Sequence, residues 1–448
     1  MMERLRKRKF WQSILLFAYS SLAASGVFAQ ENDREKIEEL KTLNRVVFID
    51  RNAKRVTAPI SCINFSAFQE GLARVLATEE AQDSVISLRE GFIDKKGNWA
   101  VRPRKWEYRH AHKFCEGLAV RSYRVAEDEL ASDVFRFAYI DKSGKFAIRP
   151  PARQLSTYEL QVVGAAFDFS EGIALLRWDL LRRAGRSYPF QRYVEEQRYS
   201  FVDKEGKFIL DLSQDMKAIE PDQDDQDYWQ SVEAYNQEAY ERKRKGSSFS
   251  NGLALIEYKG KLGFIRKDGS WLGPTNDAAL PFSEGLAYIR NGEEAAFIDT
   301  NGKLAFKLPA IYDTYGASFH EGLCRQRSKW NKIGSPAEAV LRYIDRKGNT
   351  VFSLNEGKQK SFIHYAGDFS CGLALLRQGD KYGYIDKKGA WKIPPRFERA
   401  EPFHEGIARV SLDQYHHQYI DTDGKLVFDA GVKEGSFFAE GLMGVWVR

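Results

Sequence analysis

Short apolar runs, separated by glycines and charged residues, recur along nearly the whole chain. The clearest example spans residues 369–403, where the apolar runs 373–376 and 382–385 are separated by a charged turn. Runs this short, rich in aromatic and aliphatic residues and bounded by turn formers, predict β-strands. Trp391, Lys392 and Ile393 then alternate apolar with polar and predict a third strand. We expect Pro394 and Pro395 to end it, because proline donates no ladder hydrogen bond.

Two phrases repeat in a fixed order. The first, Phe-x-Glu-Gly-Leu-Ala or a near variant, occurs nine times, with its glycine at positions 71, 117, 172, 252, 285, 322, 372, 406 and 441. The second, aromatic-Ile-Asp-x-x-Gly, has its glycine at positions 97, 144, 206, 269, 302, 348, 389 and 424, with a degraded copy at Phe48-Ile49-Asp50. Successive first phrases lie 33 to 55 residues apart, except for one gap of 80. Self-similarity of this kind predicts an array of structural repeats.

Each unit is predicted to be a three-stranded antiparallel meander of strands a, b and c. The link from Asp386 to Gly389 fits a type I turn closed by a glycine at positive φ. The Asp carboxylate can accept hydrogen bonds from the turn backbone. Since one meander is marginally stable alone, neighbouring units must stack to bury their aromatic faces.

The strand types at the two ends of the chain indicate whether the array is open or closed. The chain opens with a b–c pair, residues 46–50 and 55–59, and ends on an a strand, residues 441–447. In an open solenoid that last strand would be an unprotected apolar edge. The fold class predicted is therefore all-β: about nine three-stranded units with one helical insertion, in a propeller-like closed ring in preference to an open β-solenoid.

The repeated phrase resembles the WG repeat, also called KWG, of bacterial proteins. Residues 381–386 read Lys-Tyr-Gly-Tyr-Ile-Asp, where the family has Lys-Trp/Tyr-Gly-Tyr/Phe-Ile-Asp, and residues 91–99 and 263–265 match further. Departures are Arg266 for the Asp, and Asn251 and Cys371 for the Glu of the first phrase. The resemblance covers the chain from about residue 46 to its end. It implies a β-repeat scaffold without a single activity or a transferable catalytic set.

The first 29 residues predict a signal peptide. Five basic residues precede an apolar stretch, and Val27 and Ala29 place small residues before Gln30, so we expect cleavage there. An uncleaved anchor is the alternative, disfavoured by the serines and the short apolar run. No lipidated cysteine follows the cleavage site. The mature protein is thus expected to be exported (periplasmic, cell-surface or secreted) and not to span a membrane.

Five segments follow from these patterns. They are the signal peptide 1–29, a charged lead-in 30–45, WG-type repeats 46–210, an insertion 211–247 and WG-type repeats 248–448. The insertion has an acidic run from Glu220 to Asp227, after which Trp229, Val232 and Tyr235 recur at helical spacing. An amphipathic helix over residues 228–245 is predicted to dock on the β array.

Charge and cysteine content exclude several classes of protein. The 448-residue chain carries a formal charge of +6, of which the signal peptide holds five basic residues and one acidic residue, leaving about +2. Basic and acidic residues interleave, which argues against a nucleic-acid partner. The four cysteines (62, 115, 324 and 371) allow three pairings and lack zinc-site or redox spacing. We expect free or singly paired cysteines that pack as small apolar residues.

The candidate chemistry is sparse. An Asp or Glu that recurs at one position of every unit is best interpreted as serving the unit. The acidic run at 222–227 lacks the glycine that an EF-hand loop requires. His110, His112, His416 and His417 lack further ligands at suitable spacing. No catalytic, cofactor-binding or metal-binding residue is predicted, and no cofactor.

Three function hypotheses remain. The leading one is an exported, non-enzymatic β-repeat scaffold that binds a protein or a cell-envelope glycan, since Tyr, Trp and Arg are abundant and repeat arrays present long surfaces. The alternatives are an envelope hydrolase with its site on inserted loops, and a purely structural spacer. Two carboxylates from different units converging in a deep pocket would favour the hydrolase.

Overall fold

The computed structural model describes most of the repeat region. The described residues are 45–80, 86–105, 113–123, 136–151, 153–156, 159–184, 191–221, 246–309, 312–313, 318–328, 340–354, 363–413, 416–431 and 438–447. The predicted signal peptide, residues 30–44 of the lead-in and the predicted helix at 228–245 lie outside them. Within the described ranges every element is a strand and every strand pair is antiparallel. The fold is therefore all-β, built from many small antiparallel sheets.

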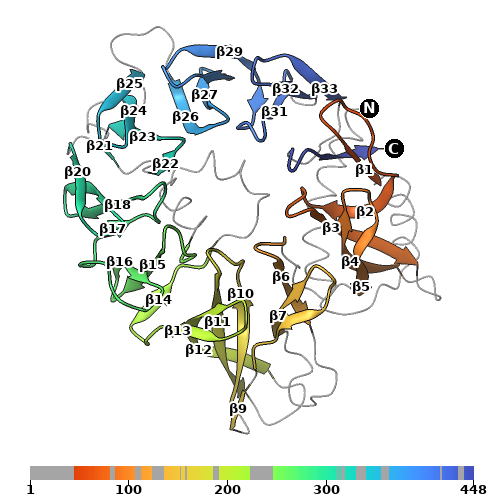
Figure 1. Cartoon of the computed structure of the whole chain (residues 1–448), viewed down its shortest axis with the longest axis vertical. Helices are drawn as coiled ribbons and strands as arrows, with labels where there is room; N and C mark the ends of the chain where they lie inside the picture. Colours follow the sequence, from red (N-terminus) through yellow and green to blue (C-terminus); the bar gives the residue numbers. More distant parts are fainter. Residues whose placement is uncertain are drawn as a thin grey trace.

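The units are numbered after the glycine of the first phrase, from unit 1 (Gly71) to unit 9 (Gly441). Figure 1 shows their sheets following one another in chain order around a common centre. Units 1 to 4 contain β2 (Ile60–Phe65), β3 (Leu72–Glu80), β4 (Ile86–Asp94) and β5 (Trp99–Lys105); β6 (Leu118–Tyr123), β7 (Arg136–Asp141) and β8 (Phe146–Ile148); β9 (Arg153–Ser156), β10 (Glu159–Ala166), β11 (Ile173–Ala184), β12 (Gln191–Asp203) and β13 (Phe208–Asp211); and β14 (Met216–Ala218), β15 (Leu253–Tyr258) and β16 (Lys261–Arg266).

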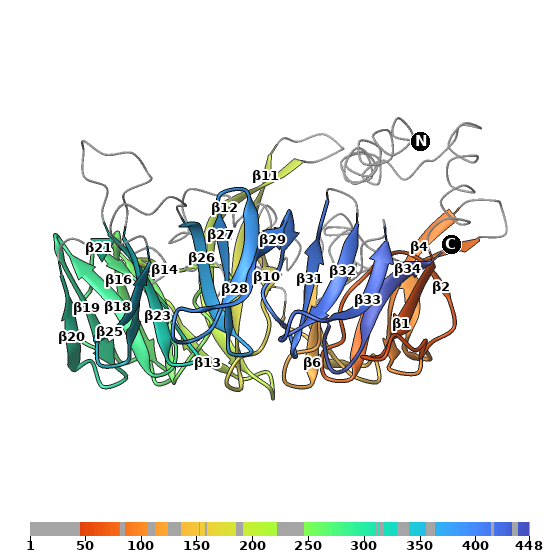
Figure 2. The same ribbon diagram turned by 90° about the horizontal axis from the view of Figure 1, so that it is seen from above.

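Units 5 to 9 continue the series. They contain β17 (Ala278–Ala279), β18 (Leu286–Asn291), β19 (Glu294–Asp299) and β20 (Leu304–Leu308); β21 (Tyr312–Asp313), β22 (Phe319–His320), β23 (Leu323–Ser328), β24 (Leu341–Asp345) and β25 (Thr350–Leu354); β26 (Ile363–Ser370), β27 (Leu373–Gln378), β28 (Lys381–Ile385) and β29 (Trp391–Phe397); β30 (Arg399–Ala400), β31 (Ile407–Ser411), β32 (His417–Asp421) and β33 (Leu426–Gly431); and β34 (Met443–Val447) with β1 (Arg45–Ile49). Figure 2 shows that β11 and β12 reach beyond the other strands.

Several units have one strand more than the predicted three. In unit 7, β26 precedes the first phrase and pairs with β27, with Ser370 opposite Leu373. The first phrase is therefore a hairpin turn rather than the start of a strand, and the residues before it add a fourth strand to the sheet. Four-stranded sheets also occur in units 5 and 8, and the described strands of unit 2 form the predicted three-stranded sheet. The four strands of unit 1 belong to a six-stranded sheet that also contains β1 and β34.

The second turn has the predicted geometry. In unit 7 the Gly389 amide donates to the Asp386 carbonyl at 3.0 Å, and Gly389 has φ +83°. The Asp386 carboxylate accepts from the amides of Lys388 and Ala390 at 2.9 and 3.0 Å. This is a type I turn closed by a glycine at positive φ, and the Asp side chain holds it.

The two prolines after this turn do not end the strand, contrary to expectation. β29 runs through Pro394 and Pro395, and its register with β28 shifts on either side of Tyr384. A Cβ on Gly383, which lies opposite, would come within 2.6 Å of the Ile393 carbonyl and 2.7 Å of the Pro395 nitrogen. The prolines thus form an irregularity on an edge strand, and the glycine of the Tyr-Gly-Tyr phrase lets the two backbones approach.

The core is divided among the unit interfaces. Among the described residues, nine clusters of buried apolar side chains each combine residues of two neighbouring units, and a tenth, small cluster lies within unit 3. At most interfaces an aromatic ring of strand b meets the phenylalanine of the next first phrase. In unit 7 and unit 8, for example, the ring centroids of Tyr384 and Phe403 are 4.7 Å apart. The units are therefore stabilised by their neighbours, as stacked repeats are.

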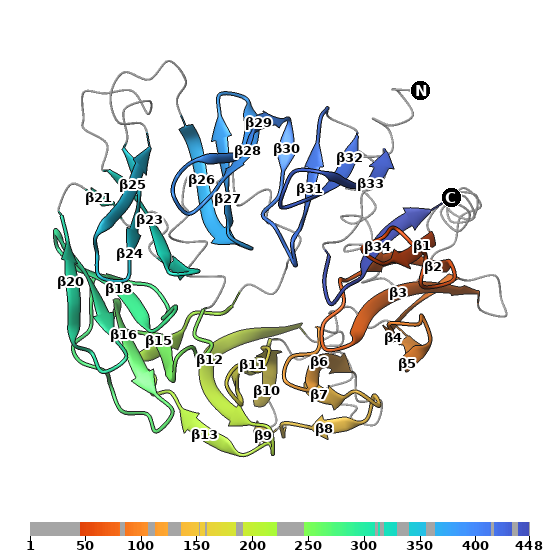
Figure 3. The same cartoon turned by 45° about the horizontal axis from the view of Figure 1, so that its top comes forward.

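The last strand pairs with the first, as the phase of the chain ends predicts. β34 and β1 are antiparallel, with Phe48 opposite Gly444 and Val47 opposite Val445. Figure 3 shows the two strands side by side. The rings of Phe48 and Phe68 are 4.8 Å apart, so unit 9 also contacts unit 1 through its core.

The predicted insertion is partly integrated into the β array. Met216, Lys217 and Ala218 form β14, which pairs with β15. The Ser247 amide donates to the Ile219 carbonyl at 2.7 Å, so the chain leaves and returns at neighbouring points. The array thus extends beyond the predicted boundary at residue 210. No described helix is long and apolar enough to cross a membrane.

Candidate functional site

The repeated acidic residues of the first phrase link each unit to the next. Each occupies, with the following glycine, a two-residue hairpin turn in which both residues have positive φ, 49–55° and 79–90° respectively. The side chain accepts a hydrogen bond from the glycine amide of the next unit, at 2.8–2.9 Å for an oxygen acceptor and 3.3 Å for Cys371. The last link joins Glu440 to the amide of Gly71.

A cation beside the second turn completes this link. The residue after the turn aspartate contacts the glutamate of the preceding unit, as Lys142 does at 3.3 Å from Glu70. Equivalent contacts with the carboxylate are made by Arg51, Lys95, Lys204, Lys267 and Lys387. Arg346 instead donates to the backbone carbonyl of Glu284 at 2.7 Å. Where Asn251 or Cys371 replaces the glutamate, the cation is replaced by a threonine, Thr300 or Thr422.

These links account for the recurring carboxylates. The two turns lie at the same end of their strands, where each Glu is bound to a backbone amide and, in seven units, to a cation. The lowered pKa of Glu440 fits this role, because burial opposes ionisation but Lys95 and the Gly71 amide outweigh it. The prediction that these groups serve the unit is consistent with this geometry. The glutamate and the cation of the next unit are replaced together, and this paired change is visible in the sequence. It becomes apparent only when neighbouring units are compared.

The other residues considered from sequence do not form a site among the described residues. All four cysteines are free thiols, and burial raises the pKa of Cys62 and of Cys324 to about 12. The His417 ring bonds the Ser411 hydroxyl at 2.9 Å, and His416 lies on the surface near Asp413. In the described ranges no group of three His, Cys, Asp or Glu is placed to hold a metal ion. His110, His112 and the acidic run at 222–227 lie outside those ranges.

A dense charged cluster joins unit 3 to the start of unit 4. The Arg177 guanidinium donates to Asp179 at 2.9 Å and to both oxygens of Glu220 at 2.9 and 3.0 Å. The Tyr199 hydroxyl donates to Glu220, and burial, with the charge of Glu220, raises the pKa of Tyr199 to about 12. A single guanidinium thus bridges both carboxylates, which makes the cluster an internal ion-pair network.

Aromatic pairs recur at equivalent positions of three successive units. In each of units 2, 3 and 4, two aromatic residues pack against each other. One lies six positions after the glycine of the first phrase, and the other lies two positions after the glycine of the second phrase. The pairs are Tyr123 with Phe146, Trp178 with Phe208 and Tyr258 with Trp271, at centroid distances of 5.2, 5.7 and 5.9 Å. No other unit has aromatic residues at both positions. Strands β8 and β13, which begin with Phe146 and Phe208, lie on the outer side in Figure 3.

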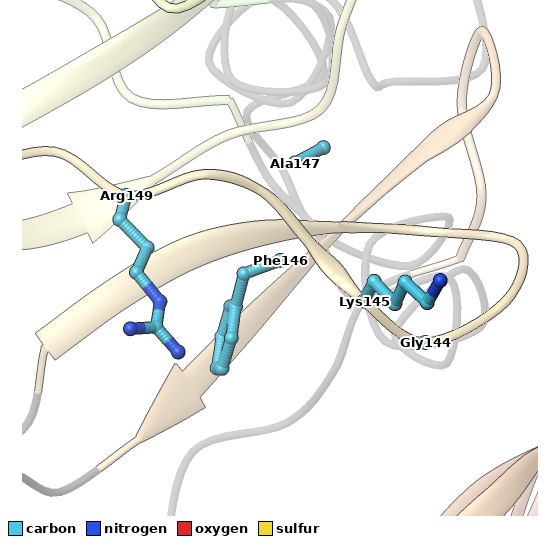
Figure 4. Close-up of a pocket in the computed structure, with 5 residues that line it drawn as sticks. All are labelled: Gly144, Lys145, Phe146, Ala147 and Arg149. Carbon is cyan, nitrogen blue, oxygen red and sulfur yellow. The ribbon is translucent and has the colours of Figure 1, made fainter.

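The first pair borders an open depression of about 660 Å³ lined by Lys145, Phe146 and Arg149. The Arg149 guanidinium lies 3.9 Å from the centroid of the Phe146 ring. Figure 4 shows these two side chains next to each other, with Lys145 pointing away from them. A cation over an aromatic face is held there electrostatically.

The second pair lies in a smaller pocket of about 200 Å³ in unit 3. Its aromatic wall is held in place because the Trp178 indole donates to the Ser200 hydroxyl at 2.7 Å. Gln161, Arg198 and Asp211 add polar groups to the lining. Glu196 holds the Arg198 guanidinium, whereas Gln161 and Asp211 make no side-chain hydrogen bond with any described residue.

Comparison with known proteins identifies the repeat. Residues 363–382 and 382–415 match the family model of the WG containing repeat. These segments are WG repeats. The first match covers β26 and β27, and the second covers most of β28 and then β29 to β31. Together they span the sheet of unit 7 and the hairpin that opens unit 8.

Solved structures similar to this chain include β-propellers. A WD40 β-propeller domain of Doa1 is 10% identical, covers 67% of this chain and 92% of its own, and has a TM-score of 0.24. The β-propeller domain of Cps50 (Swd1) from Myceliophteria thermophila is 11% identical, covers 64% and 99%, and has a TM-score of 0.25. A eukaryotic initiation factor is 8% identical over 84% and 85%, with a TM-score of 0.43. A search of curated proteins found no relative in sequence.

Proposed function

We propose that the WG-type units form a closed, propeller-like ring and that this ring is an exported, non-enzymatic scaffold that binds an extended partner along its outer side. The partner is a protein or a cell-envelope glycan. The observation that carries the proposal is the aromatic pair repeated at equivalent positions of three successive units, two of them beside a pocket.

Closure is supported by contacts between the ends of the array. Unit 9 is itself assembled from the two ends of the array, because β34 pairs with β1. It meets unit 1 through a shared apolar cluster and the Glu440 link to Gly71, which are the same kinds of contact found between the other neighbours, and β1 also pairs with β2. A closed ring leaves no unpaired terminal strand, which removes an edge that would otherwise invite aggregation.

A double-mutant cycle on Phe65 and Trp446 tests closure, since their ring centroids are 4.9 Å apart. In a closed ring, Phe65→Leu and Trp446→Leu should be coupled by about 0.5–1.5 kcal/mol, the usual range for an aromatic pair. Additive effects on unfolding would contradict closure, because in an open array the two residues lie at opposite ends.

Binding is favoured over hydrolysis by the chemistry of the pockets. A glycosidase uses two carboxylates on either side of the scissile bond. The described lining of the unit 3 pocket has one, Asp211, and that of the unit 2 depression has none. Aromatic and arginine side chains, by contrast, are typical of binding hot spots.

A capture experiment tests the scaffold role. The mature chain and a Phe146→Ala/Phe208→Ala variant serve as baits in an envelope extract of the producing cells. The control, Trp99→Ala/Leu426→Ala, removes exposed apolar residues from the same repeat position in units without an aromatic pair. Capture by the wild type and the control but not by the variant is expected. Nothing above background, or equal capture by all three, would refute the proposed role.

Intact-mass measurement of the exported protein tests the proposed export and signal-peptide cleavage. The mature protein is expected to start at Gln30.

A further inference from the structure

The pockets of units 2 and 3 point to the chemistry of the partner. We infer that they are successive subsites for a glycan chain, one sugar ring in each, and this inference rests on the proposed scaffold function. It selects one of the two partner classes and assigns it to named side chains.

The unit 3 pocket combines the two features by which proteins recognise sugars. Trp178 and Phe208 offer an aromatic wall for the apolar face of a pyranose ring, and Phe208 is 36% exposed. The Gln161 amide can donate and accept hydrogen bonds, Asp211 accepts them and Arg198 donates them. This set suits sugar hydroxyl groups, because each hydroxyl both donates and accepts hydrogen bonds. A volume of about 200 Å³ is below the roughly 300–1,000 Å³ of pockets for drug-sized ligands, so it suits a single ring.

The charges at this pocket disfavour a simple ion as ligand. Asp211 opposes a small anion, and Arg198 opposes the cation that an aromatic wall could otherwise attract. Because Glu196 already holds Arg198 at 2.8 Å, the guanidinium is oriented rather than mobile. The lining is thus suited to a neutral polyol or to a sugar with one acidic group.

Recurrence is the argument for a chain rather than a single sugar. The equivalent pair in unit 2, Tyr123 and Phe146, is flanked by Arg149, and that in unit 4, Tyr258 and Trp271, by Lys259, whose ammonium lies 5.2 Å from the Tyr258 ring centroid. Aromatic platforms with polar neighbours at one position of three successive units match a ligand that itself repeats. Linked weak subsites raise the overall affinity without any single strong contact.

The probes are chitohexaose, cellohexaose and a hexameric oligo-uronate, titrated against the purified full chain by calorimetry and saturation-transfer NMR. At least one should bind, and Phe208→Ala and Asp211→Asn should each weaken it about tenfold or more. The matched control is Trp99→Ala, because Trp99 has the same repeat position and is 37% exposed but has no aromatic partner at the other position. The Tm of each variant shows whether it is misfolded. Gln161→Ala is included because Gln161 lies outside the apolar core, so its loss should not impair folding.

Each outcome decides the inference. Binding that is lost with Phe208→Ala and Gln161→Ala but kept with Trp99→Ala supports it, and the preferred probe separates neutral from acidic sugars. Failure of all three probes, or equal loss with Trp99→Ala, overturns it. If the envelope capture then still recovers a protein in a Phe208-dependent way, the scaffold function stands and the partner is a protein.

Discussion

Gly389 tests how tightly the units are packed against one another. It closes the second turn of unit 7 at φ +83°, and an added Cβ would lie 2.7 Å from Cδ2 and 2.8 Å from Cγ of Phe352 in unit 6. The Phe352 ring is stacked on Tyr343 at a centroid distance of 4.8 Å, so it has little room to retreat. Alanine at this position therefore meets two separate costs.

The magnitudes follow from these two costs. The left-handed backbone costs an alanine about 1–2 kcal/mol, of which about 0.4–1 is offset because alanine also restricts the unfolded chain. Overpacking against the neighbouring ring adds about 1–3 kcal/mol. Gly389→Ala should thus destabilise the protein by about 1–4.5 kcal/mol. Gly372→Ala is the control, because Gly372 has φ +80° but nothing within 4 Å of its Cβ position. Gly372→Ala should cost about 1.5 kcal/mol or less, because only the backbone cost applies.

The assay is urea unfolding of both variants, followed by tryptophan fluorescence and by circular dichroism, with midpoints and slopes compared. Phe352→Leu combined with Gly389→Ala should be less destabilising than the sum of the single changes, because the smaller side chain relieves the clash. Equal losses for Gly389→Ala and Gly372→Ala would refute the packing argument, and additive effects of Gly389→Ala and Phe352→Leu would place the cost elsewhere.

Three further changes test the links between units. The double variant Cys371→Glu/Thr422→Lys should raise the free energy of unfolding by up to about 1 kcal/mol, because it restores the carboxylate and cation found in other units. Thr422→Lys alone should not raise it. An unchanged urea midpoint for the double variant would contradict the link. Deleting residues 442–448 should lower the midpoint strongly, since Leu442 is buried in one apolar cluster and Met443 and Val445 are buried in another. A small loss would argue against closure. Asp141→Asn should destabilise the protein at pH 7. The hydrogen bonds that the Asp141 carboxylate accepts from the Ser143 hydroxyl and from the turn amides lower its pKa below the unfolded value of about 3.9. The stabilisation by the ionised carboxylate is therefore fully present above about pH 3.9 and is lost as the pH falls through the folded pKa. The difference from wild type should shrink in urea titrations below about pH 4, and a constant difference would count against an ionised turn.

Local chemistry was readable from single units of the sequence. Short apolar runs predicted the strands, and the Asp-x-x-Gly phrase predicted the turn that Asp386 and Gly389 form, because both depend on residues within a few positions of each other. The phase of the chain ends likewise predicted that residues 441–447 pair with the first strand. The strand before the Glu-Gly type of turn, such as β26 in unit 7, is not predicted, since that phrase looks like a strand start until its two residues are known to have positive φ.

What only the tertiary structure decided are the contacts between units. The function of Glu70 depends on the amide of Gly117 and on Lys142, both in another unit, and nothing within its own unit specifies them. The same holds for the aromatic pairs: Trp178 and Phe208 are 30 positions apart, and only the folded sheet brings their rings to 5.7 Å beside Gln161 and Asp211. Repetition in a sequence determines the unit, because each copy carries the same short-range pattern. A surface is determined by residues that differ between copies, and the fold alone sets which of those become neighbours.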